Sequence, residues 1–260
     1  MKPAIVGHGG ASCTSDQQGA VDSAIEKAWA GLLHHDSAID AAIQAVSLME
    51  DDIRLNAGTG SNPRIGGKIQ LDAAIATNDG RFGSVIGIEE TPNPIFVAAS
   101  LLSNSVNTLY GSDARDFADI RGIAKHPVVG RRNHSSDTVG AIARDTQGVI
   151  AVASSTGGPP DRIPGRVGDT AIFGSGVWCD STVGIAATGI GEAIMRDVSC
   201  FRVAQCYLGS AGAISLSDCI IEYLDKVGET FEIGFIALTS NGMGLGIANT
   251  AMPWRFCTCD

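Results

Sequence analysis

The sequence is poor in aromatic residues and in charge, and these shortages exclude whole classes of protein. Phe, Trp and Tyr make up 5% of the chain, and Asp, Glu, Lys and Arg together make up 18%. The charges present are mostly acidic, with a net charge of −10, so the basic surface typical of a nucleic-acid-binding protein is missing. No run of about 18 apolar residues occurs. We therefore expect neither a nucleic acid nor a membrane as partner.

Disulfide spacing and an export signal are also missing. The seven cysteines are odd in number and irregularly spaced. The apolar part of the N-terminal MKPAIVGHGG is too short for a secretion signal, so we expect reduced thiols in the cytoplasm. The segment Cys-Thr-Cys at 257–259 offers two metal ligands, whereas structural zinc takes four, so we expect no zinc site there.

The common catalytic templates are absent as well. The chain has no G-x-S-x-G elbow, no Walker loop and no H-E-x-x-H helix. Its five histidines are scattered, and none stands beside a cysteine or a carboxylate at ligand spacing. Nucleophilic serine and metal-dependent hydrolysis therefore have no support in the sequence.

Glycine, in contrast, is abundant. The 33 glycines among 260 residues are nearly double the usual share of about 7%. Hydrophobic residues make up 44%, which is a globular composition, and the length suffices for one large core. Many glycines indicate tight turns and close backbone approach, as in layered folds that contain sheets.

Hydrophobic periodicity and turn residues predict hairpins and paired helices. The expected strands and hairpins are 3–7, 68–77 with 82–88, 138–156, 183–187, and 231–239 with 243–250. The expected helices are 15–34, one from Ser37 to about 48, 92–106, 113–120, 191–208 and 215–227. A doubly wound fold needs regular alternation of strand and helix, which this order lacks. We expect an α+β fold of two packed sheets with helices outside both.

Three threonines mark the ends of apolar strands. Thr138 begins a predicted strand, whereas Thr156 and Thr188 each end one and precede a glycine. An isolated threonine at a strand end is explained by β propensity alone. Threonine becomes a nucleophile when it is the first residue of a chain, because its α-amine, with a pKa of about 7.7–8.0, takes the hydroxyl proton. Such chemistry requires cleavage between Asp137 and Thr138.

Ordered motifs give the chain a specific resemblance. DTVGAIARD from 137, SSTGG at 154–158, GRVGD at 165–169 and ATGIGE at 187–192 resemble the plant-type asparaginase and isoaspartyl peptidase family. GHGGA at 7–11, EDDIRLNAGTGS at 50–61, LDAAI at 71–75 and GFIALTSNG at 234–242 extend the resemblance over nearly the whole chain. These are N-terminal-nucleophile hydrolases, a group that also includes aspartylglucosaminidase and taspase.

The resemblance implies a fold and an activity. The expected fold is a four-layer αββα sandwich in a single domain, 1–260, cut into an α portion, 1–137, and a β portion, 138–260. The expected reaction is self-cleavage followed by hydrolysis of L-asparagine or β-aspartyl dipeptides through an acyl-enzyme, with release of aspartate. No cofactor is expected for catalysis, and the processed protomers are expected to form a homodimer.

The resemblance also assigns roles to residues. Thr138 is the nucleophile, supported by Thr156, and Asp137-Thr138 is the cleaved bond. Thr188 and the Gly189 N–H match the oxyanion hole, and Asn56 belongs to the NAG motif of the site. Arg166 would bind the substrate α-carboxylate, and Asp169 with the Gly191 carbonyl the α-ammonium. A structural sodium ion would be held by main-chain carbonyls in the loop that contains Met49, Glu50, Asp52, Leu55, Ala57 and Thr59.

Several departures from the family pattern keep other interpretations open. The segment before Thr138 is short, so an uncleaved chain that acts as a binding protein is one alternative. Asn62-Pro63 and Pro159-Pro160 are unusual and border the expected site, so substrate preference stays open between asparagine, isoaspartyl peptides and glycosylated asparagine. Trp178-Cys179 resembles taspases, but taspases lack the acid found here as Asp169. Without the family motif, Arg166 and Asp169 would be typical of a local surface ion pair.

Overall fold

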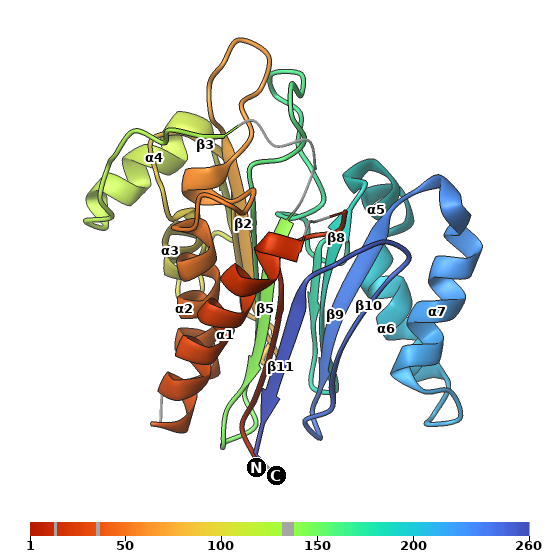
Figure 1. Ribbon diagram of the computed structural model, residues 1–260. Helices are drawn as coiled ribbons and strands as arrows, with labels where there is room; N and C mark the ends of the chain where they lie inside the picture. Colours follow the sequence, from red (N-terminus) through yellow and green to blue (C-terminus); the bar gives the residue numbers. More distant parts are fainter. Residues whose placement is uncertain (13–14, 35–36, 132–137, 260) are drawn as a thin grey trace.

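The computed structural model describes residues 1–12, 15–34, 37–131 and 138–259. Two β-sheets face each other in the middle of the molecule, and helices lie on their outer sides (Figure 1). The fold is therefore of the α+β type that the hairpins predict. No helix in these described ranges is long and apolar enough to cross a bilayer.

The larger sheet holds seven strands among the described residues, in the order β11-β1-β5-β6-β2-β3-β4. Its strands are β1 (Ala4–His8), β2 (Leu71–Thr77), β3 (Phe82–Ile88), β4 (Thr108–Tyr110), β5 (Thr138–Arg144), β6 (Ile150–Thr156) and β11 (Trp254–Thr258). All neighbours run antiparallel except β3 and β4, which are parallel. The first and last strands of the chain pair with each other, so the two ends of the sequence close one edge of this sheet.

The smaller sheet has the order β10-β9-β8-β7 within the described part of the chain. Its strands are β7 (Val177–Cys179), β8 (Val183–Gly189), β9 (Ile233–Thr239) and β10 (Gly244–Ala248). All of them belong to the part of the chain after Thr138, whereas the larger sheet mixes both parts. The two portions are therefore interleaved within one structure.

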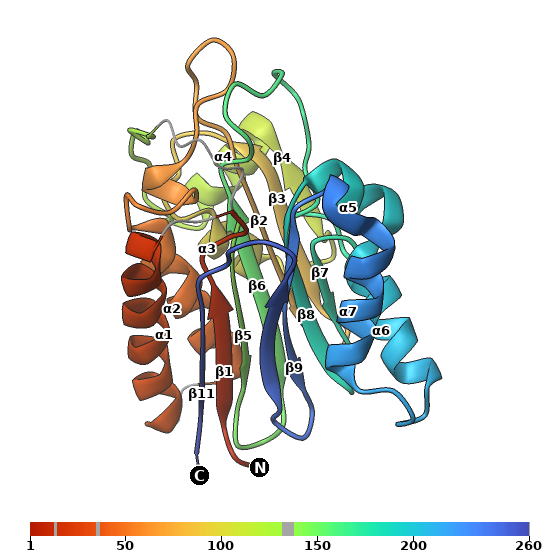
Figure 2. The same cartoon turned by 45° about the vertical axis from the view of Figure 1, so that its right-hand side comes forward.

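Helices cover the outer face of each sheet (Figure 2). Beside the larger sheet lie α1 (Gln18–Leu33), α2 (Ala38–Glu50), α3 (Pro94–Ser100) and α4 (Gly111–Ile120); beside the smaller one lie α5 (Gly191–Asp197), α6 (Ser199–Gly209) and α7 (Leu216–Val227). Short 3-10 turns occur at η1 (Ser15–Gln17), η2 (Gly58–Gly60) and η3 (Gly228–Thr230). The alanine-rich α2, expected from Ser37, begins at Ala38, and the Ser37 side chain accepts the Asp40 N–H and so caps the helix.

Three apolar clusters hold the layers together. One joins α1 to α4 with the outer face of the larger sheet, and a second joins α5 to α7 with the smaller sheet. The third lies between the sheets and includes Val6, Ile142, Val152, Ala186 and Ile236. Because side chains alternate along a strand, a residue two positions from Ile142, such as Gly140, faces the same gap between the sheets.

The central hairpin of β5 and β6 forms as the sequence predicts. Its turn runs from Asp145 to Gly148, and Gly148 adopts a φ of +87°, which glycine tolerates best. The Asp145 carboxylate accepts the N–H groups of Gln147 and Val149 and fixes the turn. The resulting register places Thr138 directly opposite Thr156.

Two predicted helices are shorter in the structure. The helix expected over 92–106 ends at Ser100, because the chain then turns to place β4 beside β3, where the Ser84 N–H bonds the Asn107 carbonyl. The helix expected over 191–208 breaks at Val198, which has a φ of +51°. After the break, the N–H groups of Cys200 and Phe201 donate to loop carbonyls at 174–175. These bonds satisfy the first turn of α6, so tertiary contacts override the helical periodicity.

The helix expected over 15–34 begins at Gln18, after the turn η1, and the side chain of its N-cap residue Gln17 does not cap it. Strands β4, β7 and β11 were not predicted; the first two have only three residues. Strand β11 contains Cys257 and pairs with β1. Each of these strands depends on its neighbour more than on its own sequence.

Candidate active site

The ends of three strands bring hydroxyl groups together between the sheets. Thr138 begins β5, Thr156 ends β6, and Thr188 stands one residue before the end of β8 in the opposite sheet. All three side chains are buried. The backbone N–H of Thr138 donates to the Thr188 Oγ1 over 3.3 Å, so the first residue of β5 is joined to the facing sheet.

The Thr188 hydroxyl accepts two backbone N–H groups and keeps its own proton available. Its Oγ1 accepts the Thr138 N–H and, over 3.2 Å, the N–H of Ala11. A hydroxyl oxygen has two lone pairs and one proton, so these two bonds leave the proton to donate elsewhere. Ala11 comes from the loop after β1, which gives the sequence GHGGA a place at the site.

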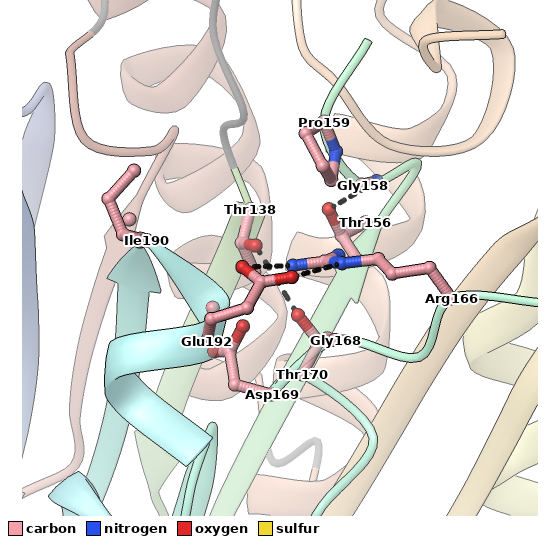
Figure 3. Close-up of a pocket in the computed structure, with 12 residues that line it drawn as sticks. Thr138, Thr156, Gly158, Pro159, Arg166, Gly168, Asp169, Thr170, Ile190 and Glu192 are labelled. Atoms are coloured by element: carbon pink, nitrogen blue, oxygen red, sulfur yellow. Dashed lines mark hydrogen bonds and ion pairs between the residues drawn. The ribbon is translucent and has the colours of Figure 1, made fainter. Parts of the chain in front are cut away.

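A pocket opens beside Thr138. It encloses ≈ 360 Å³ of empty space, its open mouth included, and lies where both sheets meet the loop after β6 (Figure 3). Its lining consists of Thr138, Thr156, Gly158, Pro159, Arg166, Gly168, Asp169, Thr170, Gly189, Ile190, Gly191 and Glu192. Most of the residues predicted from the motifs thus line one small cavity, although they are spread over more than fifty positions of sequence.

Asn56 lies outside the lining of the pocket and supports its wall. Its Nδ2 donates to the Gly158 carbonyl over 3.0 Å, and its main-chain carbonyl accepts the Gly157 N–H. Its Oδ1 accepts the Asn62 N–H over 2.8 Å. The Thr156 hydroxyl accepts the Gly158 N–H over 2.9 Å, so Asn56 and Thr156 together fix the turn after β6.

The carboxylate partner of Arg166 is Glu192, at the start of α5. The guanidinium Nε and Nη2 donate to the two Glu192 oxygens over 2.8 and 2.9 Å, a bidentate pair (Figure 3). The Arg166 side chain is 16% exposed and that of Glu192 67% exposed. The alternative interpretation, a local pair of Arg166 with Asp169, is therefore not the ion pair that the described residues form, and the Arg166 guanidinium holds a carboxylate in bidentate geometry.

Asp169 is buried without a full set of partners. Its Oδ2 has no hydrogen-bond partner among the described residues. Burial raises the pKa of Asp169 to about 7; the nearby charges of Asp72 and Glu192 add to the rise and that of Arg166 opposes it. An unpaired buried carboxyl that faces a cavity is suited to bind a cation there.

Two glycines permit the close packing at the start of α5. A Cβ on Gly191 would lie 2.7 Å from both Arg166 Nη2 and Asp169 Oδ1, so a side chain there would displace both groups. Gly189 has a φ of +126°, and a Cβ there would lie 2.0 Å from the Glu232 carbonyl oxygen. The backbone of both residues is consequently exposed to the pocket, as an oxyanion hole or a carbonyl ligand requires.

His8 is unsuited to act as the base. The ring is completely buried, and burial lowers its pKa to about 3. It packs against Gly140, where a Cβ would lie 2.5 Å from Nε2, and neither ring nitrogen has a partner among the described residues. A group this weakly basic removes protons poorly near neutral pH.

Sequence reasoning missed three residues at the site. Thr170 lines the pocket with its Oγ1 3.3 Å from Thr138 Oγ1. Asp72 is buried opposite Thr156 and bonds the N–H groups of Gly87 and Gly168. Glu192 stands within the motif ATGIGE, whereas Thr170 directly follows the motif GRVGD and lies outside it. The predicted cleavage residue Asp137 lies outside the described residues, as does the bond that joins it to Thr138.

Comparison with known proteins agrees with the motifs. The chain matches the profile of the family described as Asparaginase over residues 1–129 and 125–259. It is 32% identical over 249 residues to an N(4)-(beta-N-acetylglucosaminyl)-L-asparaginase of Elizabethkingia miricola, which covers 83% of this chain and 72% of that protein. It is 36% identical over 227 residues to an isoaspartyl peptidase/L-asparaginase of Xenopus laevis, covering 75% and 73%.

A third relative is longer than this chain in its aligned part. A probable isoaspartyl peptidase/L-asparaginase of Drosophila melanogaster is 30% identical, covering 98% of this chain and 92% of that protein. The alignment spans 311 positions, more than the 260 residues of this chain, so the fly protein carries insertions that this chain lacks.

Proposed function

The chain belongs to the asparaginase family, and on that premise we propose that it cleaves itself before Thr138 and releases aspartate from L-asparagine or β-aspartyl dipeptides. The observation that carries the proposal is one pocket that contains Thr138, Arg166 and Asp169, with the Thr188 hydroxyl bonded to the Thr138 N–H. The pocket thus has a nucleophile, an anion-stabilising donor and two charged groups for an amino-acid substrate.

Cleavage before Thr138 supplies the catalytic base. In the intact chain, the Thr138 nitrogen is an amide and cannot take a proton. After cleavage it is an α-amine with a pKa of about 7.7–8.0 in model peptides, well matched to neutral pH. The amine and the hydroxyl belong to one residue, so they are adjacent without further positioning.

The reaction then proceeds by acyl transfer. The Thr138 Oγ1 gives its proton to the α-amine and attacks the side-chain carbonyl carbon of the substrate. Negative charge develops on the carbonyl oxygen, and the Thr188 hydroxyl and the Gly189 N–H are the proposed donors to it. The leaving nitrogen takes the proton, the C–N bond breaks, and water hydrolyses the Thr138 ester to release aspartate.

Substrate recognition follows from the charges of the pocket. We assign the substrate α-carboxylate to Arg166 and the α-ammonium to Asp169 and the Gly191 carbonyl. Glu192 must release the Arg166 guanidinium before the substrate carboxylate can take the same bidentate bonds. Since Glu192 is mostly exposed, its carboxylate can return to water at low cost.

The finer architecture is part of the same proposal. We infer the αββα sandwich of N-terminal-nucleophile hydrolases as a single domain, 1–260, with an α portion, 1–137, and a β portion, 138–260. The interleaving of both portions in the larger sheet supports it, because the fragments would stay together after cleavage. A homodimer of processed protomers is proposed from the family, and light scattering of the purified protein tests it.

A structural sodium ion fits the loop after α2. A Cβ on Gly60 would lie 2.1 Å from the Leu55 carbonyl oxygen and 2.7 Å from that of Ile53, so main-chain oxygens point into the loop. The carbonyls of Met49, Asp52 and Ala57 each accept one N–H, which leaves a second lone pair for a hard cation. Those of Glu50 and Thr59 complete the proposed set. Exchange of sodium for choline in the buffer should lower Tm if the ion binds.

Glycosylated asparagine is the second candidate substrate. The similarity to the Elizabethkingia miricola protein, named for activity on such a compound, favours its inclusion. A substrate panel therefore contains L-asparagine, a β-aspartyl dipeptide and N4-(β-N-acetylglucosaminyl)-L-asparagine, with released aspartate as the common readout. The alternative of an uncleaved binding protein predicts release from none of them.

Intact mass measurement and a denaturing gel test the proposal. The wild type should yield two fragments that meet at 137/138, and Thr138→Ala should remain one chain without activity. Thr146→Ala is the matched control, because Thr146 is exposed in the turn at the other end of the same hairpin. A wild type that stays full-length after prolonged incubation, or releases no aspartate from the panel, would refute the proposal.

A further inference from the structure

Thr170 places a second hydroxyl against the proposed nucleophile. Its Oγ1 lies 3.3 Å from Thr138 Oγ1, in a contact that is buried from solvent. The side chain is 1% exposed and lines the pocket (Figure 3). No role was expected for Thr170 from the sequence motifs, because they end at the preceding Asp169.

A tight turn fixes the position of Thr170. The Asp169 carbonyl accepts the N–H groups of Ile172 and Gly176 over 2.8 and 3.2 Å. Gly176 packs so closely that a Cβ there would lie 2.7 Å from the Thr170 Cα. The Gly176 carbonyl in turn accepts the Ala187 N–H over 2.9 Å, which ties the turn to the strand that carries Thr188. The Thr170 hydroxyl is therefore held by backbone on a rigid element.

The hydroxyl groups of Thr156 and Thr188, which lie nearby, bond backbone groups. That of Thr156 accepts the Gly158 N–H and shapes the loop after β6. That of Thr188 accepts two N–H groups and directs its proton away from them. Thr170, in contrast, places its hydroxyl against the oxygen that must attack.

We propose that Thr170 is a catalytic residue that donates its hydroxyl hydrogen to Thr138 Oγ1 and stabilises the charge that develops on this oxygen. The inference rests on the proposed function of Thr138. In the attack, the Thr138 O–H bond breaks, its proton moves to the α-amine, and the new bond joins Oγ1 to the acyl carbon. Thr170 keeps its own proton throughout, so it transfers no charge. Its donated bond leaves the Thr138 proton directed to the base.

The same assistance applies to self-cleavage. There the Thr138 Oγ1 attacks the carbonyl carbon of the preceding residue, the C–N bond to Thr138 breaks, and the hydroxyl proton passes to the nitrogen that leaves. The product is an ester, which water then hydrolyses. The oxygen again becomes more negative as it loses its proton. One substitution at Thr170 should consequently slow two reactions that share this nucleophile but differ in substrate.

The test compares Thr170→Val, which removes the hydroxyl and keeps the branched shape, with Thr170→Ser, which keeps the hydroxyl. We expect Thr170→Val to lower kcat about 10- to 100-fold, per cleaved enzyme, with KM within about two-fold, since the lost bond strengthens only in the transition state. Self-cleavage, followed by intact mass, should slow similarly. Thr170→Ser should retain kcat within about five-fold of wild type, because the donor remains.

A control separates this role from a structural one. Thr77→Val removes another buried hydroxyl, at the far end of β2, where it bonds the Asp79 carboxylate over 2.5 Å. It should leave kcat and the cleavage rate unchanged. If Thr170 served only to position Asp169, Thr170→Val would raise KM and leave the cleavage rate near that of wild type; this outcome would overturn the inference.

Two further outcomes would also refute the role of Thr170. One is a Thr170→Val variant with the wild-type kcat and cleavage rate. The other is a Thr170→Ser variant that is as impaired as Thr170→Val although both variants keep the wild-type Tm. Failure of the proposed function would give different results in the same assays. A wild type that cleaves itself but releases no aspartate refutes the substrate assignment, and the cleavage rates of the variants then decide the role of Thr170. A wild type that neither cleaves nor hydrolyses refutes both proposals.

Discussion

Glu50 should make the stability of this protein depend strongly on pH. The residue ends α2 with no exposure to solvent, and its Oε1 accepts the N–H of Ile95 over 3.2 Å. Its Oε2 has no hydrogen-bond partner among the described residues. Burial raises the pKa of Glu50 from the ordinary 4.5 to about 8, although the polar groups of Ser155, Ile95 and Asn93 beside it oppose the rise. The fold therefore holds Glu50 as a neutral acid near neutral pH.

The sign of the effect follows from proton linkage. Below pH 4.5, the folded and the unfolded chain both hold the proton, and the stability contributed by neutral Glu50 is fully present. Between pH 4.5 and 8 only the folded chain holds it, so stability falls as pH rises. Above pH 8 both forms are ionised and the loss is complete. With about 1.36 kcal/mol per pKa unit, the loss amounts to at most about 5 kcal/mol.

Glu50→Gln removes the ionisation and keeps the shape. At pH 9 the variant should be more stable than the reference protein, with a Tm higher by roughly 10 °C for a domain of this size. At pH 5 the two should differ by only about 1 kcal/mol, the cost of a partly unsatisfied amide. The measurement is thermal unfolding from pH 5 to 9, with Thr138→Ala as the common background so that every chain stays continuous.

Glu222→Gln is the matched control, because Glu222 is exposed in α7 and pairs with Lys226 on the surface. An exposed pair contributes little, so this variant should follow the reference curve at every pH. Parallel curves for Glu50→Gln and the reference from pH 5 to 9 would refute the argument, since Glu50 would then not be neutral in the fold.

Three further predictions concern the pocket. Glu192→Gln should lower KM for asparagine about two- to five-fold at unchanged kcat, because the competing carboxylate on Arg166 is weakened at a site that solvent already screens; an unchanged KM would contradict the competition. The kcat/KM of the wild type should fall in two stages as pH drops. The first lies below about 8, where the Thr138 α-amine gains a proton, and the second below about 7, where Asp169 gains one and loses its attraction for the substrate ammonium. Asp169→Asn should lower kcat/KM about 100-fold and abolish the second stage; a variant whose profile has the wild-type shape would exclude Asp169 from binding. Gly191→Ala should raise KM at least about ten-fold with a small change in Tm, since its Cβ would reach Arg166 and Asp169; kinetics like those of the wild type would show that both groups can move aside.

Local patterns in the sequence were sufficient to predict the central hairpin. Alternating β-branched residues and a turn that ends in Gly148 specify β5 and β6, and the register then places Thr138 opposite Thr156 without further information. The ordered motifs identified the family and most of the pocket lining. The start of α2 at Ser37 was also predicted correctly, because the cap that fixes it bonds a residue only three positions away.

Structural features that depend on contacts between distant parts of the chain could not be predicted from the sequence, because packing decides them. The periodicity of 191–208 is helical throughout, yet the chain breaks at Val198, where loop carbonyls satisfy the start of α6. Strand β11 forms because it pairs with the edge of β1, and nothing within 254–258 indicates that partner. Arg166 pairs with Glu192, which lies 26 positions further along the chain at the start of α5, so the spacing within GRVGD did not reveal this partner.

The sequence by itself determined the elements near Thr138, the family and the set of chemical groups, since each of these is encoded by residues close together in the chain. The tertiary structure alone decided which groups meet. The packing of one sheet on the other brings Thr188 to the Thr138 nitrogen, and the turn after Asp169 brings Thr170 to the Thr138 hydroxyl. Fifty and thirty-two positions separate these pairs, and only the buried face between the sheets holds them at hydrogen-bonding distance.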